Sequence, residues 1–112
     1  MNCPNAIFER LAVCSWSVQP ENPSHLIDQL AIIGLTKTQL ALSPLIQNPA
    51  WHDAPQQLDQ AGIQIVSGMF GCIGEDYSTL ESIRQTGGIV LDKTWNQDWN
   101  HIEPVWSLAN HW

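Results

Sequence analysis

Residues 57–70 read QLDQAGIQIVSGMF, and residues 29–42, 28 positions earlier, read QLAIIGLTKTQLAL. Each stretch begins at the end of a helical pattern, passes through a glycine that is a natural helix stop, and continues into an apolar run. The repeat predicts two helix-to-strand units in succession. Strands that alternate with helices at this period are typical of the βαβ pattern, which produces a parallel sheet.

The apolar runs and the helix signals predict the order of elements around this repeat. Asn22 is a suitable N-cap with Pro23 in the first helical position, so a helix is predicted from there to Gly34. A second helix is predicted over about residues 51–61, before Gly62. Right-handed crossovers would place both helices on one side of the sheet. Three buried strands are predicted, at residues 11–17, 38–42 and 63–70.

Beyond the third strand the pattern changes to a loop and two more helices. Ser78 and Glu81 have capping-box spacing, which predicts a short helix over residues 79–85. A final helix shows one continuous face of apolar residues, and we expect this face to pack on the outer side of the sheet or on a neighbouring helix. Its members are Trp95, Trp99, Ile102, Trp106 and Ala109.

Three parallel strands with outer helices make an α/β fold whose sheet is open at both edges. A whole (β/α)8 TIM barrel needs about 250 residues, whereas this chain has 112. We therefore predict the first three β/α units of a TIM barrel, an incomplete barrel over residues 10–112 that is truncated before strand 4. Residues 1–9 are predicted to be an N-terminal tail.

The composition limits the partners of the chain. Eleven acidic side chains oppose four basic ones, for a formal net charge of −7. This balance excludes nucleic acid and disfavours an anionic membrane, because both require a cationic surface. Three cysteines without a CxxC pair argue against a disulfide framework and a thiolate zinc site, and free thiols fit a cytoplasmic location. No signal peptide or apolar run of about 20 residues is present.

Five short stretches carry a family resemblance that extends over about residues 10–112. The sequence resembles the bacterial sugar phosphate isomerase/epimerase family, which belongs to the xylose isomerase-like TIM barrel superfamily. The stretches are Cys14-Ser-Trp-Ser17, Gln39-Leu-Ala-Leu42, Ser67-Gly-Met-Phe70, Glu75-Asp-Tyr-Ser78 and Ile83-Arg-Gln-Thr-Gly-Gly88.

The resemblance implies a divalent-metal-dependent sugar, or sugar phosphate, isomerase or epimerase. Such enzymes hold a divalent metal (Mn, Co or Mg) with two Glu, an Asp and a His, and move a proton next to a ketose carbonyl. In the family these ligands come from later strands. No metal ligand or catalytic base is therefore assigned in this chain, and we expect the fragment to bind no metal.

Candidate substrate-binding residues are those near the carboxyl ends of the strands, where TIM barrels carry their sites. Trp16 can stack on the C–H face of a sugar or pack against the following helix. Gln39 is a polar residue in an apolar strand, and it can reach a substrate hydroxyl or bond to a neighbouring strand. Phe70 can form a wall of the pocket or simply belong to the core.

Other chemically distinctive residues favour structural roles. Cys72 has no histidine partner in the pattern, so a nucleophilic function is not expected. Arg84 is a local candidate for a substrate phosphate, with pairing to Glu81 or Asp92 as the alternative. The four histidines lack HxH or HxxxH spacing and are expected to face solvent or to cap helices.

The residues and the family resemblance are compatible with two hypotheses for the function, one enzymatic and one non-catalytic. The first is the N-terminal part of a metal-dependent sugar isomerase or epimerase, with a small-molecule sugar as its substrate. The second is a non-catalytic α/β fragment that self-associates through its open sheet edges or needs a complementing half. The scarcity of basic residues favours an unphosphorylated sugar under the first hypothesis.

Overall fold

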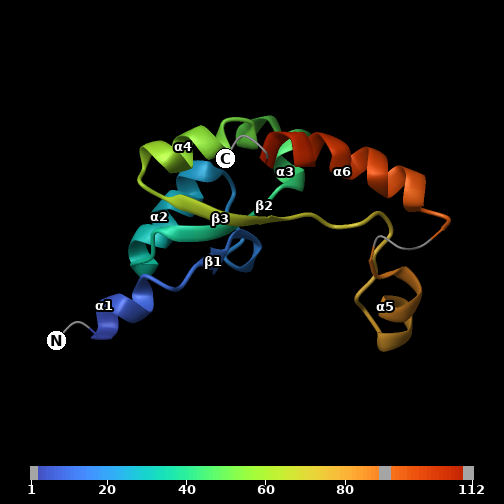
Figure 1. Ribbon diagram of the computed structural model, residues 1–112, viewed down its shortest axis with the longest axis horizontal. Coiled ribbons are helices and arrows are strands. Elements are labelled where there is room, and N and C mark those ends of the chain that lie inside the picture. Colours follow the sequence, from blue (N-terminus) through green and yellow to red (C-terminus); the bar gives the residue numbers. More distant parts are fainter. Residues whose placement is uncertain (1–2, 89–91, 110–112) are drawn as a thin grey trace. The chain divides into compact units, whose positions relative to one another are not determined.

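The computed structural model describes residues 3–88 and 92–109, and it shows an α/β chain with a three-stranded parallel sheet. The strands lie side by side in chain order (Figure 1). This confirms the predicted adjacency and direction of the three strands. They are β1 (Val13–Cys14), β2 (Lys37–Ala41) and β3 (Gln64–Met69).

The chain divides into two units, Met1–Met69 and Phe70–Trp112. The first contains the sheet with its connecting helices, and the second contains a loop and two helices. The predicted tail at residues 1–9 includes a short helix, α1 (Cys3–Phe8). Among the described residues, no helix combines the length and apolar character needed to cross a bilayer.

Helix α2 (Pro23–Ile33) follows its predicted boundaries because both of its ends are encoded locally. The Asn22 side chain accepts a hydrogen bond of 2.8 Å from the His25 amide, which satisfies one of the free N–H groups of the first turn. At the other end Gly34 adopts φ 86°, a left-handed conformation that glycine reaches without a Cβ clash. The chain then enters β2.

The second connection differs from the prediction in its first half. Helix α3 (Ser43–Gln47) and the short 3₁₀ helix η2 (Pro49–Trp51) follow the second predicted strand, where the sequence predicts no helix before about residue 51. Ser43-Pro44 does follow the end of β2, but the proline then occupies the first turn of a helix, where its missing N–H leaves no lost bond. Helix α4 (Ala54–Gln60) and Gly62, with φ 77°, complete the repeat as predicted.

The core of the first unit lies on the helix-covered side of the sheet. Helices α2 and α4 pack against each other, so both crossover helices lie on the same side (Figure 1). Along β2, Thr38 and Leu40 are fully buried, whereas Gln39 on the opposite face is half-buried. The buried apolar residues from the helices are Leu26, Leu30, Leu45, Ala54 and Leu58.

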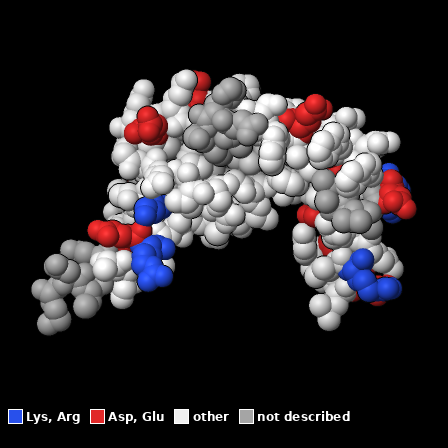
Figure 2. Space-filling view, viewed as in Figure 1, with Lys and Arg blue, Asp and Glu red and all other residues white. Residues whose placement is uncertain are grey.

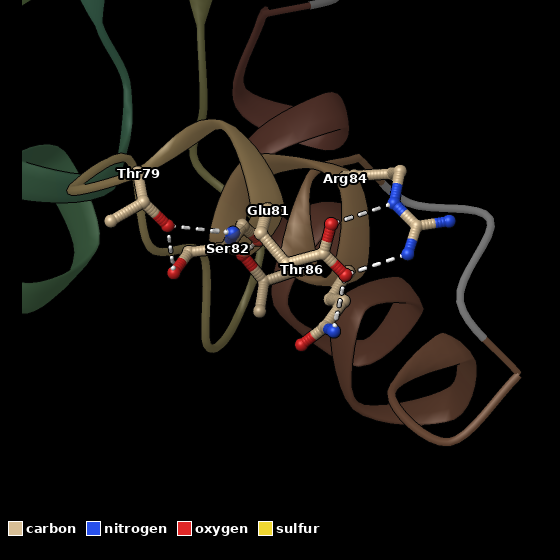
Figure 3. Close-up of polar contacts among 6 residues, drawn as sticks. Thr79, Glu81, Ser82, Arg84 and Thr86 are labelled. Atoms are coloured by element: carbon tan, nitrogen blue, oxygen red, sulfur yellow. Dashed lines mark hydrogen bonds and ion pairs between the residues drawn. The ribbon is translucent and has the colours of Figure 1, made fainter.

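The second unit has a short helix, α5 (Leu80–Thr86), whose start lies one residue later than the capping-box pattern suggests. Thr79, and not Ser78, is the N-cap, and its Oγ1 accepts a hydrogen bond of 3.0 Å from the Ser82 amide (Figure 3). Arg84 pairs with Glu81, with a closest N–O distance of 2.6 Å. Of the two roles predicted for Arg84, phosphate binding and pairing with a nearby carboxylate, the structure shows the pairing with Glu81.

Helix α6 (Trp95–Ala109) forms where the apolar repeat predicts a helix, but among the residues whose burial is described it buries only part of the predicted face. Asp98, Ile102 and Val105 are its buried residues. Trp95, Trp99 and Trp106 are exposed, and the rings of the first two stack with centroids 6.2 Å apart. The predicted apolar face is thus buried at Ile102 and exposed at Trp95, Trp99 and Trp106.

Candidate functional site

A pocket of about 320 Å³ lies in the first unit, beside the carboxyl ends of β1 and β2. Its walls come from the segment after β1 and from the segment after β2. This end of a parallel α/β sheet is where such folds place their binding residues. The lining residues are Ser15, Trp16, Gln19, Pro20, Glu21, Ala41, Pro44, Asn48 and Trp51.

Ser15 holds the pocket wall that follows β1 in place. Its buried hydroxyl accepts a hydrogen bond of 2.9 Å from the Ala41 amide at the end of β2. The 3₁₀ helix η1 (Ser15–Ser17) begins at this contact, so the chain turns as soon as it leaves β1. Trp16 follows immediately and remains 39% exposed. The sequence therefore anchors the backbone next to Trp16 while leaving its ring accessible.

The loop after η1 is fixed by a contact from α2. The side-chain nitrogen of Gln29 donates a hydrogen bond of 2.6 Å to the carbonyl of Val18. The next residue, Gln19, adopts φ 48°, a left-handed conformation that costs a non-glycine residue on the order of 1 kcal/mol. Backbone strain of this kind is concentrated at binding sites, and here it places an amide side chain in the pocket wall.

The opposite wall is built by the two short helices after β2. Trp51 at the end of η2 is only 6% exposed. It therefore belongs to the core and also lines the pocket. Asn48 caps η2, because its Oδ1 accepts a hydrogen bond of 3.0 Å from the Ala50 amide. That bond fixes the side chain and leaves the amide nitrogen as a donor for a ligand.

These groups together suit a small polyhydroxylated ligand. An accessible indole can stack on the apolar face of a sugar ring. Amide and carboxylate groups, here Gln19, Asn48 and Glu21, exchange hydrogen bonds with hydroxyls. None of the lining residues is Lys or Arg. The pocket therefore favours a neutral ligand over a phosphate or a carboxylate.

The three residues proposed from the sequence have different positions. Trp16 lies in the pocket wall. The Gln39 side-chain oxygen accepts a hydrogen bond of 3.4 Å from the Cys14 thiol, its register partner on β1, so it makes the structural bond between strands. Phe70 is the first residue of the second unit and is not among the lining residues of this pocket in the described chain.

Apart from Ser15, which lies at the end of the first predicted strand, the polar or aromatic lining residues other than Trp16 are not predicted from the sequence as site residues. Gln19 and Glu21 lie in the break between the first strand and helix, and Asn48 and Trp51 lie in the break after the second strand. An available signal was that both breaks follow the carboxyl end of a predicted strand. Loops at that end carry the ligand contacts in α/β folds.

Cys72 and its neighbours form a second polar cluster, in the other unit. Burial raises the pKa of the Cys72 thiol to about 11, and the carboxylates of Asp98 and Glu75 add to the shift. Asp98 is fully buried, and its Oδ1 accepts a hydrogen bond of 2.6 Å from the Ile73 amide. A thiol with so high a pKa is protonated at neutral pH, and the cluster therefore does not supply a nucleophile.

Within residues 3–88 and 92–109, no three side chains of His, Cys, Asp or Glu gather in a way that could hold a metal ion. Comparison with protein-family models, with curated proteins and with solved structures gives no match. The function of the chain is therefore inferred from the geometry and chemistry of the pocket, with the family resemblance as a guide to the reaction.

Proposed function

We propose that this chain is the sugar-holding N-terminal part of a divalent-metal-dependent sugar isomerase or epimerase. In this proposal β1, β2 and β3 correspond to the first three β/α units of a TIM barrel. The reaction is proton transfer next to a ketose carbonyl, as the family resemblance implies. The supporting observation is the pocket at the carboxyl ends of β1 and β2, where an accessible Trp16 faces amide and carboxylate groups.

The proposed division of roles follows from the residues in the pocket. Trp16 stacks on the sugar ring, and the side-chain amides of Gln19 and Asn48 bind its hydroxyls. The described residues do not fit a divalent-metal site, because they lack a cluster of three ligating side chains. No step of the isomerisation is therefore assigned to them, and their contribution is to bind and orient the sugar.

The proposal favours an unphosphorylated substrate. The pocket contains the carboxylate of Glu21 and no basic side chain, so a phosphate would be repelled. Arg84, the basic residue that the sequence suggested for phosphate, makes its ion pair with Glu81 on α5. A ketose such as D-fructose is expected to bind more tightly than the same ketose with a phosphate group.

The test is the binding of D-fructose and D-fructose 6-phosphate to the wild-type chain and to W16A, measured by saturation-transfer NMR. We expect W16A to weaken D-fructose binding about tenfold, because the stacking surface is lost. The matched control is W106A, which removes an exposed tryptophan from the second unit.

Two outcomes would contradict the site, and a third would contradict the choice of substrate. Equal losses of binding in W16A and W106A would show that any exposed indole captures the sugar without a site. A folded W16A protein with unchanged affinity would also exclude the pocket. Tighter binding of the phosphorylated ketose would show that the ligand contacts a cationic surface elsewhere in the chain.

A further inference from the structure

Strand β3 is an edge of the sheet in the described part of the chain. The Gln64 amide donates a hydrogen bond of 2.8 Å to the Thr36 carbonyl, and the Met69 carbonyl accepts one of 2.8 Å from the Leu42 amide. These groups therefore point toward β2. Because the backbone alternates along a strand, the N–H and C=O of Gly68 point the opposite way. This backbone side offers hydrogen bonds to another strand.

The β3 edge has few of the features that prevent an exposed strand from pairing with a strand of another chain. Residues 64–70 contain no charged side chain and no proline. One bulge is present at Val66, since the register partners of Thr38 and Gln39 are Ile65 and Ser67. The strand beyond the bulge is regular. Val66 and Met69 are each 45% exposed, so pairing there would also bury apolar surface.

Charge indicates what kind of strand fits this edge. The chain as a whole has a net charge of −7, so two copies repel each other over most of their surface. In the first unit, the charged side chains seen in Figure 2 lie around the margins, and the surface over the sheet is largely uncharged. A neutral strand can face an identical neutral strand without the repulsion that opposes contact elsewhere.

We propose that β3 is a self-association surface, on which the β3 strand of a second copy pairs antiparallel about a twofold axis. Such an interface is isologous, so each copy supplies the same strand and receives the same contacts. Strand β1, at the other edge, has two residues and offers too short a ladder. The edge and the sugar pocket involve different residues, so the two proposals are tested by different variants.

The test is sedimentation velocity of the chain over a wide range of concentration. We expect wild type to form a dimer and V66K to weaken it by at least about tenfold, because the lysine removes apolar surface from the edge and adds a positive charge from each copy to the same interface. S67K is the second variant, since it adds the same charge without removing an apolar side chain. I32K is the matched control, because Ile32 is 86% exposed on α2 and lies away from β3.

Hydrogen exchange of the Gly68 amide gives an independent reading. Dimerisation through β3 should slow exchange of this amide as the wild-type concentration rises, and should not do so in S67K. A monomer at every concentration would overturn the proposal. So would a dimer that V66K and S67K leave intact but that W99K disrupts, because the exposed tryptophan face of α6 would then be the interface.

Discussion

The thiol of Cys72 has its ionisation set by its surroundings. Its pKa is raised from 9.0 to about 11, first by burial and then by the negative charges of Asp98 and Glu75. The raised pKa means that the folded chain keeps the thiol proton where the unfolded chain has released it. Stability from this group is therefore fully present below pH 9.0 and is lost as the pH rises through about 11.

Alkylation of Cys72 by iodoacetamide should therefore be slow at pH 8 and should rise with an apparent pKa of about 11 in the folded chain. Peptide mass spectrometry would separate this residue from Cys14. In urea the same site should titrate near the ordinary value of 9.0. Removing charges with D98N and E75Q should lower the folded pKa. A folded-state value at or below that of the unfolded chain would contradict the described environment.

At the scale of elements, α2 shows how a single side chain can fix both a helix and part of the site. The Asn22 cap begins α2 at Pro23, directly after the pocket loop that contains Gln19 and Glu21. Loss of the cap leaves a first-turn N–H without its partner. The same loss would loosen the chain that positions the pocket wall.

N22A should lower the free energy of unfolding by about 1 kcal/mol, whereas N22G should lower it by only a few tenths. Urea denaturation followed by circular dichroism would measure both. The matched control is S24A, which removes a small polar group from an exposed position on the same helix. If S24A and N22A cost the same, the cap would not be the source of the effect.

The predicted elements agree with the structure where their signals are local. Asn22, Gly34 and Gly62 each encode a helix end through their own backbone or side-chain chemistry, and the structure confirms all three. Helix α3 is not predicted, because Ser43-Pro44 also has the character of a strand stop. Proline is unfavourable in a helix interior but favoured in the first turn, so the same dipeptide is compatible with both structures.

The choice of buried face and of site residues depends on contacts that local patterns do not contain. The tryptophan spacing on α6 indicates a helix, yet the tryptophans are exposed whereas Asp98 is buried. The Asp98 carboxylate accepts a hydrogen bond from the Ile73 amide. In the same way, Trp16 directly follows a predicted strand and is predicted as a site residue, whereas Trp51 lies further along the segment after its strand, so the same signal marks the segment but not this residue. Trp51 reaches the pocket because α3 and η2, which pack against each other, follow the end of β2.

At the scale of the whole molecule, the net charge of −7 should oppose self-association through the β3 edge but should not oppose sugar binding in the pocket. A neutral sugar approaches an acidic chain without electrostatic cost, which suits the uncharged ligand proposed for the pocket. Self-association has to overcome the same charge, and it is therefore expected to strengthen with salt as the repulsion is screened. Sugar binding and dimerisation can thus be separated by ionic strength.

Binding of D-fructose by the whole chain should be independent of divalent metal. Among the described residues the pocket wall holds one carboxylate, Glu21, and no His or Cys, which is too small a ligand set for Mn²⁺. We therefore expect the dissociation constant in Mn²⁺ and in EDTA to agree within about twofold, with no ketose turnover in either. A marked gain with Mn²⁺ that E21Q abolishes would show that the pocket binds metal, and that the division of roles between sugar and metal is wrong. A gain that E21Q preserves would place the metal elsewhere in the chain, and the pocket would keep its role in holding the sugar.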